Sequence, residues 1–249
     1  MPKSRPLRKV AKTPRQQYKP KVGHTDWKIG QAKKMHMRQE DLSKDQSITF
    51  VCGLDESGTG SVAGPMSVGC VVLPVNSVLN VKDSKKYTTD KARDKAYDLV
   101  SSSVEFGMVE MASAADIDRY GMAPAKDYIT FKLLERMVEL YHKDDTIIIM
   151  DGSYLPKRLP DFLKGYRVVA VPKADVHITA VSAASILAKV EKDRFLLNLV
   201  ANNPSLQIYG LHENRGYLTP QHTAALKKHG PGPIHRLSIN AVKKYVKDE

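Results

Sequence analysis

Five short runs of β-forming apolar residues recur along the chain and predict the strands of a sheet. They span residues 48–54, 66–73, 104–111, 146–150 and 168–171. A glycine-rich turn separates the first two runs, which predicts a hairpin. The run at 146–150 is continuous rather than alternating, as is typical of a strand buried on both faces. The pattern therefore predicts a sheet whose centre is covered on both sides.

Segments with helical periodicity lie between and after these runs, so strands and helices alternate and the chain predicts an α/β protein. One helix is expected to begin near residue 91, and further helices are expected at 114–120, 124–141, 178–195, 221–229 and 239–246. The helix at 178–195 is rich in alanine and serine, so we expect it to lie close against the sheet. Its charged segment 189–194 is expected to face solvent. In the helix at 124–141, a stripe that includes Tyr128 is expected to face the core.

Four acidic residues stand at the ends of predicted strands: Asp55, Glu56, Asp151 and Asp175. Adjacent strand residues point to opposite faces, so at least one of Asp55 and Glu56 must face whatever covers the sheet. Carboxylates gathered at strand ends need cations, and oxygen ligands favour Mg²⁺ or Mn²⁺. Two such ions about 4 Å apart can activate water and stabilise a leaving oxygen in phosphodiester hydrolysis. The plainer alternative is that Asp55 only ends a strand and starts a turn.

Composition is that of an ordinary globular protein, with 42% apolar residues in a chain of 249. No apolar run approaches the roughly 18 residues of a membrane helix, and the N-terminus lacks a signal-peptide core. We therefore expect a soluble, cytoplasmic protein. The two cysteines, Cys52 and Cys70, fall within predicted strands, and we expect them to be reduced, buried, small apolar residues.

The net charge of +12 is concentrated near the N-terminus, where residues 1–40 hold twelve Lys and Arg against Asp26 and Glu40. Prolines and mutually repelling charges there predict a disordered basic arm over residues 1–47. Such an arm attracts nucleic acid, although a solubilising or targeting extension has a similar composition. Residues 48–249 are then the folded domain, with C-terminal helices from about residue 200. We expect a monomer, because the sequence shows no sign of a symmetric interface.

Several short motifs, in their order along residues 49–240, resemble those of the ribonuclease HII family. They are Gly53-Leu54-Asp55-Glu56, Asp83-Ser84-Lys85-Lys86, Asp151-Gly152, Lys173-Ala174-Asp175, Ala183-Ala184-Ser185-Ile186-Leu187-Ala188-Lys189-Val190 with Asp193-Arg194, Gly216-Tyr217-Leu218-Thr219, and His229-Gly230-Pro231 with Pro233-Ile234-His235-Arg236. The resemblance implies a ribonuclease H-like fold, with a central mixed five-stranded sheet flanked by helices and a C-terminal helical extension.

The same resemblance implies endonucleolytic hydrolysis of the RNA strand of RNA–DNA hybrids by two-metal-ion catalysis, which leaves a 3′-hydroxyl and a 5′-phosphate. It also implies incision at ribonucleotides embedded in duplex DNA, and hence a place in DNA replication and repair. The catalytic and metal-binding acids of the family correspond to Asp55, Glu56, Asp151 and Asp175. They would hold two Mg²⁺ or Mn²⁺ ions together with the substrate.

The expected substrate-binding residues are Gly58, Thr59, Gly60, Lys85, Lys86 and Tyr217. Thr59 stands where the family usually has arginine, and the resulting Gly-Thr-Gly loop is similar to the ribonuclease HIII form. Thr59 cannot supply a guanidinium, so the choice between a single ribonucleotide and a run of them stays open. Tyr217 resembles the family's sugar-stacking tyrosine, although it could simply pack its loop. The two lysines would meet phosphates, or else belong to a solvated loop.

Two other functions fit the same scaffold. One is a non-catalytic nucleic-acid-binding protein, against which the four costly carboxylates argue. The other is a DNA nuclease or junction resolvase, against which the loop at Gly58–Gly60 and Tyr217 argue, because these residues favour recognition of ribose.

Overall fold

A five-stranded mixed sheet forms the centre of the computed structural model, which describes residues 37–246. The strands are β1 (Phe50–Ser57), β2 (Met66–Pro74), β3 (Phe106–Ala112), β4 (Thr146–Asp151) and β5 (Arg167–Val171), in the order β3-β2-β1-β4-β5. β1, β2 and β3 pair antiparallel, whereas β1, β4 and β5 run parallel. The predicted hairpin and mixed sheet are confirmed. The parallel pairing brings the carboxyl ends of β1, β4 and β5 to one edge.

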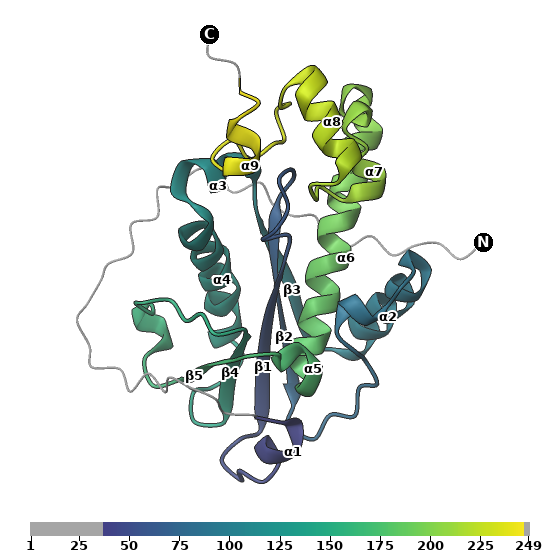
Figure 1. The fold of residues 1–249 in the computed structure, drawn as a ribbon. Helices are drawn as coiled ribbons and strands as arrows, with labels where there is room; N and C mark the ends of the chain where they lie inside the picture. Colours follow the sequence, from purple (N-terminus) through teal and green to yellow (C-terminus); the bar gives the residue numbers. More distant parts are fainter. Residues whose placement is uncertain (1–36, 247–249) are drawn as a thin grey trace.

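Helices cover both faces of this sheet (Figure 1). α2 (Asp90–Ser103), α5 (Ala174–His177) and α6 (Thr179–Asn202) lie on one side, and α3 (Ala114–Tyr120) and α4 (Met122–Val138) lie on the other. Alternate residues of β1 enter the two cores: Val51 packs on the α6 side, and Cys52 and Leu54 pack on the α4 side. Cys52 and Cys70 are both buried and free, as expected. This alternation decides which way each β1 acid points.

The small residues of α6 let it approach the sheet closely. A Cβ added at Gly53 would lie 2.3 Å from the backbone carbon of Ala180, and one added at Gly69 would lie 2.3 Å from the carbonyl oxygen of Ala184. Only glycine at these two strand positions leaves room for the helix backbone. The predicted close contact between this helix and the sheet is confirmed.

Replacing Gly53 with alanine is therefore expected to lower the free energy of unfolding by about 2 kcal/mol, because the helix must move away. Urea denaturation measures this change. A matched control is Gly60→Ala, where an added Cβ would meet Tyr217 Cε1 at an ordinary 3.8 Å and the change should stay below about 1 kcal/mol. An unchanged urea midpoint for Gly53→Ala would contradict the close approach.

Two expectations about side-chain exposure are wrong. The segment 189–194 is not solvent-facing throughout, because Lys192 is 1% exposed and Asp193 is 8% exposed. Tyr128 is exposed, whereas the buried face of α4 contains Ile129 and Leu133. Periodicity misassigned the charged segment because it cannot identify the partners that let a charged side chain be buried. It misassigned Tyr128 because an aromatic ring on an apolar stripe need not face the core.

The basic arm predicted over residues 1–47 is too long at its C-terminal end. Residues 37–47 include the short helix α1 (Gln39–Leu42), whose Leu42 is buried against the α6-side core. The side chain of Gln39 donates to the carbonyl of Val75 and accepts from the backbone N–H of Thr179. This turn is therefore part of the folded domain. The rest of the predicted arm, residues 1–36, lies outside the described residues.

A C-terminal extension follows α6 and sits at one end of the sheet (Figure 1). It contains the 3₁₀ helix η3 (Pro204–Tyr209), α7 (Leu211–Asn214), α8 (Pro220–His229) and α9 (Asn240–Lys243), so the helix expected at 239–246 is shorter than predicted. Asp118 of α3 accepts from the backbone N–H groups of Leu237 and Ser238 and ties the extension to the domain. Within residues 37–246, no helix is long and apolar enough to cross a membrane.

Candidate active site

Three of the four predicted acids meet at the edge where the parallel strands end. Carboxylate oxygens of Asp55, Asp151 and Asp175 all lie within 4.8 Å of one another. Asp55 is near the end of β1 and Asp151 ends β4, while Asp175 lies in the first turn of α5, directly after β5. The backbone N–H of Asp175 donates to Asp151 Oδ1 at 3.4 Å. The strand order therefore assembles residues that are up to 120 positions apart.

The charges of this aspartate cluster oppose one another in a site largely closed to water. Burial, assisted by the charges of Asp151 and Glu56, raises the pKa of Asp55 to about 8. Burial and the carboxylate of Asp175 raise the pKa of Asp151. A bound divalent cation would remove this repulsion, and three carboxylates are the hard-oxygen ligands that Mg²⁺ and Mn²⁺ prefer. The donor set therefore fits such an ion.

Glu56, the fourth predicted acid, points to the other face of the sheet. Its Oε2 atom lies 3.1 Å from Nζ of Lys126 on α4. It nevertheless shares a small cleft with Asp55 and Asp151, which Lys126 and Tyr154 also line. Glu56 as a metal ligand therefore stays a prediction. Lys126 was not predicted, and nothing in the pattern of α4 distinguishes it from other surface lysines.

Lys85 reaches the aspartate cluster from the 3₁₀ helix η1 (Ser84–Lys86), and its Nζ atom lies 3.2 Å from Asp175 Oδ2. The buried Asp83 caps this turn by accepting from the backbone N–H of Lys85 at 3.0 Å. The Lys85 side chain is 75% exposed, so the ammonium remains accessible from solvent although it pairs with Asp175. Lys86, the next residue, is exposed.

The glycine turn and Tyr217, far apart in sequence, lie side by side. The Cβ position of Gly60 is 3.8 Å from Tyr217 Cε1, and Thr59 beside it is exposed. Gly58 takes a φ of 87°, which favours glycine. The Tyr217 ring is 39% exposed. The turn and the ring are thus neighbours, and their role in substrate binding stays a prediction.

Two buried cations lie beneath this surface. Arg236 is fully buried and donates from Nη1 to Gly58 O at 2.7 Å and from Nε to Gly64 O at 3.0 Å. Lys192 Nζ lies 5.1 Å from the Tyr217 ring centroid and 3.1 Å from Asp193 Oδ1. Burial lowers the pKa of Lys192 to about 8, although its ion pair with Asp193 favours the charged form. These residues fix the turn and the tyrosine relative to each other.

A histidine pair supports the tyrosine loop from behind. His222 Nδ1 lies 2.9 Å from the carbonyl oxygen of Tyr217, and its Nε2 lies 2.9 Å from Nε2 of His235. Burial lowers the pKa of His235 to about 4. Burial lowers the pKa of His222 as well, so burial favours the neutral form of both rings, and one ring donates to the other.

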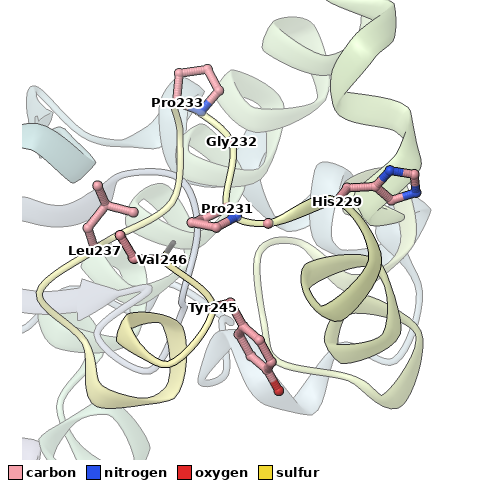
Figure 2. A pocket seen from close by; sticks show the side chains of 8 residues that line it. His229, Pro231, Gly232, Pro233, Leu237, Tyr245 and Val246 are labelled. Atoms are coloured by element: carbon pink, nitrogen blue, oxygen red, sulfur yellow. The ribbon is translucent and has the colours of Figure 1, made fainter. Parts of the chain in front are cut away.

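A separate hollow of about 380 Å³ lies in the C-terminal extension (Figure 2). Its lining includes His229, Pro231, Pro233, Leu237 and Tyr245, which surround the connection between α8 and α9. None of the three aspartates belongs to it. The hollow is therefore separate from the aspartate cluster.

Comparison with known proteins identifies the family to which the chain belongs. The family model described as Ribonuclease HII matches residues 52–242. Ribonuclease HII of Burkholderia ambifaria is 36% identical over 203 residues, which cover 82% of this chain and 87% of that protein. The crystal structure of ribonuclease H2 from Pyrococcus horikoshii OT3 has a TM-score of 0.61 and 27% identity, covering 79% of this chain and 96% of that one.

The structure of Bst-RNase HIII in complex with Mn²⁺ has a TM-score of 0.57 at 22% identity, covering 82% of this chain and 72% of that chain, and shows a likeness of fold. The fold is thus that of the type 2 ribonucleases H. The chain belongs to the ribonuclease HII family, whose members are metal-dependent endonucleases.

Proposed function

We propose that this protein hydrolyses the RNA strand of RNA–DNA hybrids, leaving a 3′-hydroxyl and a 5′-phosphate, with two Mg²⁺ or Mn²⁺ ions bound together with the substrate. The observation that carries the proposal is the cluster of Asp55, Asp151 and Asp175 at the strand ends of a ribonuclease HII domain. Glu56 completes the predicted ligand set from the adjoining cleft. Bound ions would activate water and stabilise the leaving oxygen.

Residues around the cluster supply substrate contacts. Lys85, next to Asp175, neutralises a phosphate at the cleavage site. The backbone of Gly58 and Gly60 approaches the ribose, and the 2′-hydroxyl there distinguishes RNA from DNA. Tyr217, beside Gly60, stacks on the sugar of the flanking nucleotide. The basic residues 1–36 add sequence-independent attraction to the duplex.

The first test compares two labelled duplexes in Mg²⁺ and in Mn²⁺, one with a run of ribonucleotides and one with a single ribonucleotide in DNA. We expect cleavage of the run. We also expect incision on the 5′ side of the single ribonucleotide. Its kcat/KM should be about tenfold lower than that for the run, because Thr59 lacks the charged hydrogen bond of an arginine. Cleavage of neither duplex would favour a non-catalytic binding protein, and cleavage of an all-DNA duplex would favour a DNA nuclease or resolvase.

A further inference from the structure

The ion pair between Lys126 and Glu56 places a protein cation inside the active-site cleft. The two side chains are only 19% and 29% exposed, and their charged atoms lie 3.1 Å apart. The same cleft is lined by Asp55 and Asp151 of the aspartate cluster. Because both side chains are largely shielded from water, their attraction is stronger than that of a surface salt bridge.

The lysine is also held from its other side. Its Nζ atom lies 5.0 Å from the ring centroid of Tyr154, an attractive cation–π arrangement. The hydroxyl of Tyr154 donates to Asp127 Oδ2 at 2.9 Å, which anchors that ring to α4. Tyr154 follows β4, which ends at Asp151, and Glu56 lies in β1 beside Asp55, so the residues that hold the ammonium come from the two strands that carry these aspartates. The position of Lys126 is thus determined by the site itself.

A carboxylate that is bound to an ammonium is a poor metal ligand, because the ammonium must leave before Glu56 can turn to a divalent ion. We propose that Lys126 is a positioning residue that competes with a divalent ion for Glu56. In the free protein the aspartate cluster binds one ion while Lys126 neutralises Glu56. A lysine ammonium on a flexible stem can withdraw, and an arriving substrate phosphate provides an alternative partner for it.

The inference rests on the proposed function in one respect, that Glu56 is a ligand of the second ion. It makes second-ion binding dependent on the substrate, and thereby discourages a fully loaded site in the absence of a duplex. The family resemblance implies four acids and assigns no role to a lysine on this helix.

Isothermal titration of the metal-stripped full chain with Mn²⁺, without nucleic acid, tests the proposal. We expect Lys126→Met to bind a second ion about tenfold more tightly than the parent protein, because the charged hydrogen bond to Glu56 no longer competes. First-ion affinity should stay within about threefold, since the aspartate cluster keeps its ligands. Lys126→Arg keeps the positive charge and should behave as the parent does.

Two further variants isolate the cause. Lys132→Met removes another lysine of α4, whose Nζ atom lies 2.8 Å from Glu110 Oε2. Neither residue lines the cleft, so this variant should leave Mn²⁺ binding unchanged. Glu56→Gln combined with Lys126→Met should lose the added affinity. If Lys126→Met misfolds by circular dichroism, Lys126→Gln replaces it with a polar side chain.

The outcomes separate this inference from the proposed function. Equal second-ion affinity in the parent and in a folded Lys126 variant would overturn the role of Lys126 and leave the nuclease proposal intact. Absence of Mn²⁺ binding to the parent, with no cleavage of either duplex, would overturn both.

Discussion

Replacing Asp151 with asparagine is expected to lower kcat for cleavage of the RNA strand by about 1,000-fold or more, since a metal-binding carboxylate supports several kcal/mol of transition-state stabilisation. Asp151 lies between the other members of the aspartate cluster: its strand neighbours β1, which carries Asp55, and its Oδ1 accepts from the backbone of Asp175. Single-turnover cleavage of a hybrid with a ribonucleotide run measures the loss.

The same substitution should stabilise the protein when no metal is present. The pKa of Asp151 is raised by burial and by Asp175, so above that pKa the charged carboxylate is less favourable in the folded than in the unfolded protein. Asparagine has nearly the same size without the charge, and we expect a higher unfolding temperature in EDTA. Asp144→Asn, in an exposed loop, is the control and should change neither quantity. Cleavage within tenfold of the parent rate would contradict the site assignment.

Removing the ring of Tyr217 is the second large change, and Tyr217→Ala is expected to lower kcat/KM about 100-fold because stacking on a nucleotide is lost. Tyr217→Phe keeps the ring face and should stay within about threefold. The ring is positioned by Lys192, whose Nζ atom lies 5.1 Å from the ring centroid, and by the neighbouring Gly60.

An exposed tyrosine outside the site provides the comparison. Tyr120→Ala removes a ring that is 53% exposed on α3, and it should leave kcat/KM unchanged. Full activity of a folded Tyr217→Ala variant would mean that Tyr217 only packs its loop. A loss confined to stability, without a change in kcat/KM, would lead to the same conclusion.

The location of the acids was predictable because strand periodicity assigns side chains to faces. Apolar runs ending in Asp55 and Asp151 placed both near strand ends, and the adjacency of Asp55 and Glu56 required opposite faces. The structure agrees: Asp55 contacts Ser185 of α6, and Glu56 pairs with Lys126 of α4. Asp175 followed from its place after a short buried run, which became β5.

Contacts between distant segments were not predictable in the same way. Lys192 looked like part of a charged, solvent-facing helix end, but it is buried because Asp193 and the carbonyl of Arg215 supply its partners. Arg236 stood out only as part of a family-like motif, and its bonds to Gly58 and Gly64 emerged from the packing of the extension.

The sequence alone determined the α/β class, the hairpin, the helix that lies close to the sheet and the four candidate acids, because these follow from local periodicity, residue size and family motifs. Only the tertiary structure decided that three aspartates converge, that Glu56 pairs with Lys126, and that Tyr217 lies beside Gly60. The physical reason is that periodicity fixes the face on which a side chain lies. Periodicity does not fix how far that side chain lies from side chains of other elements, or which charged group it contacts. Both depend on how the whole chain packs.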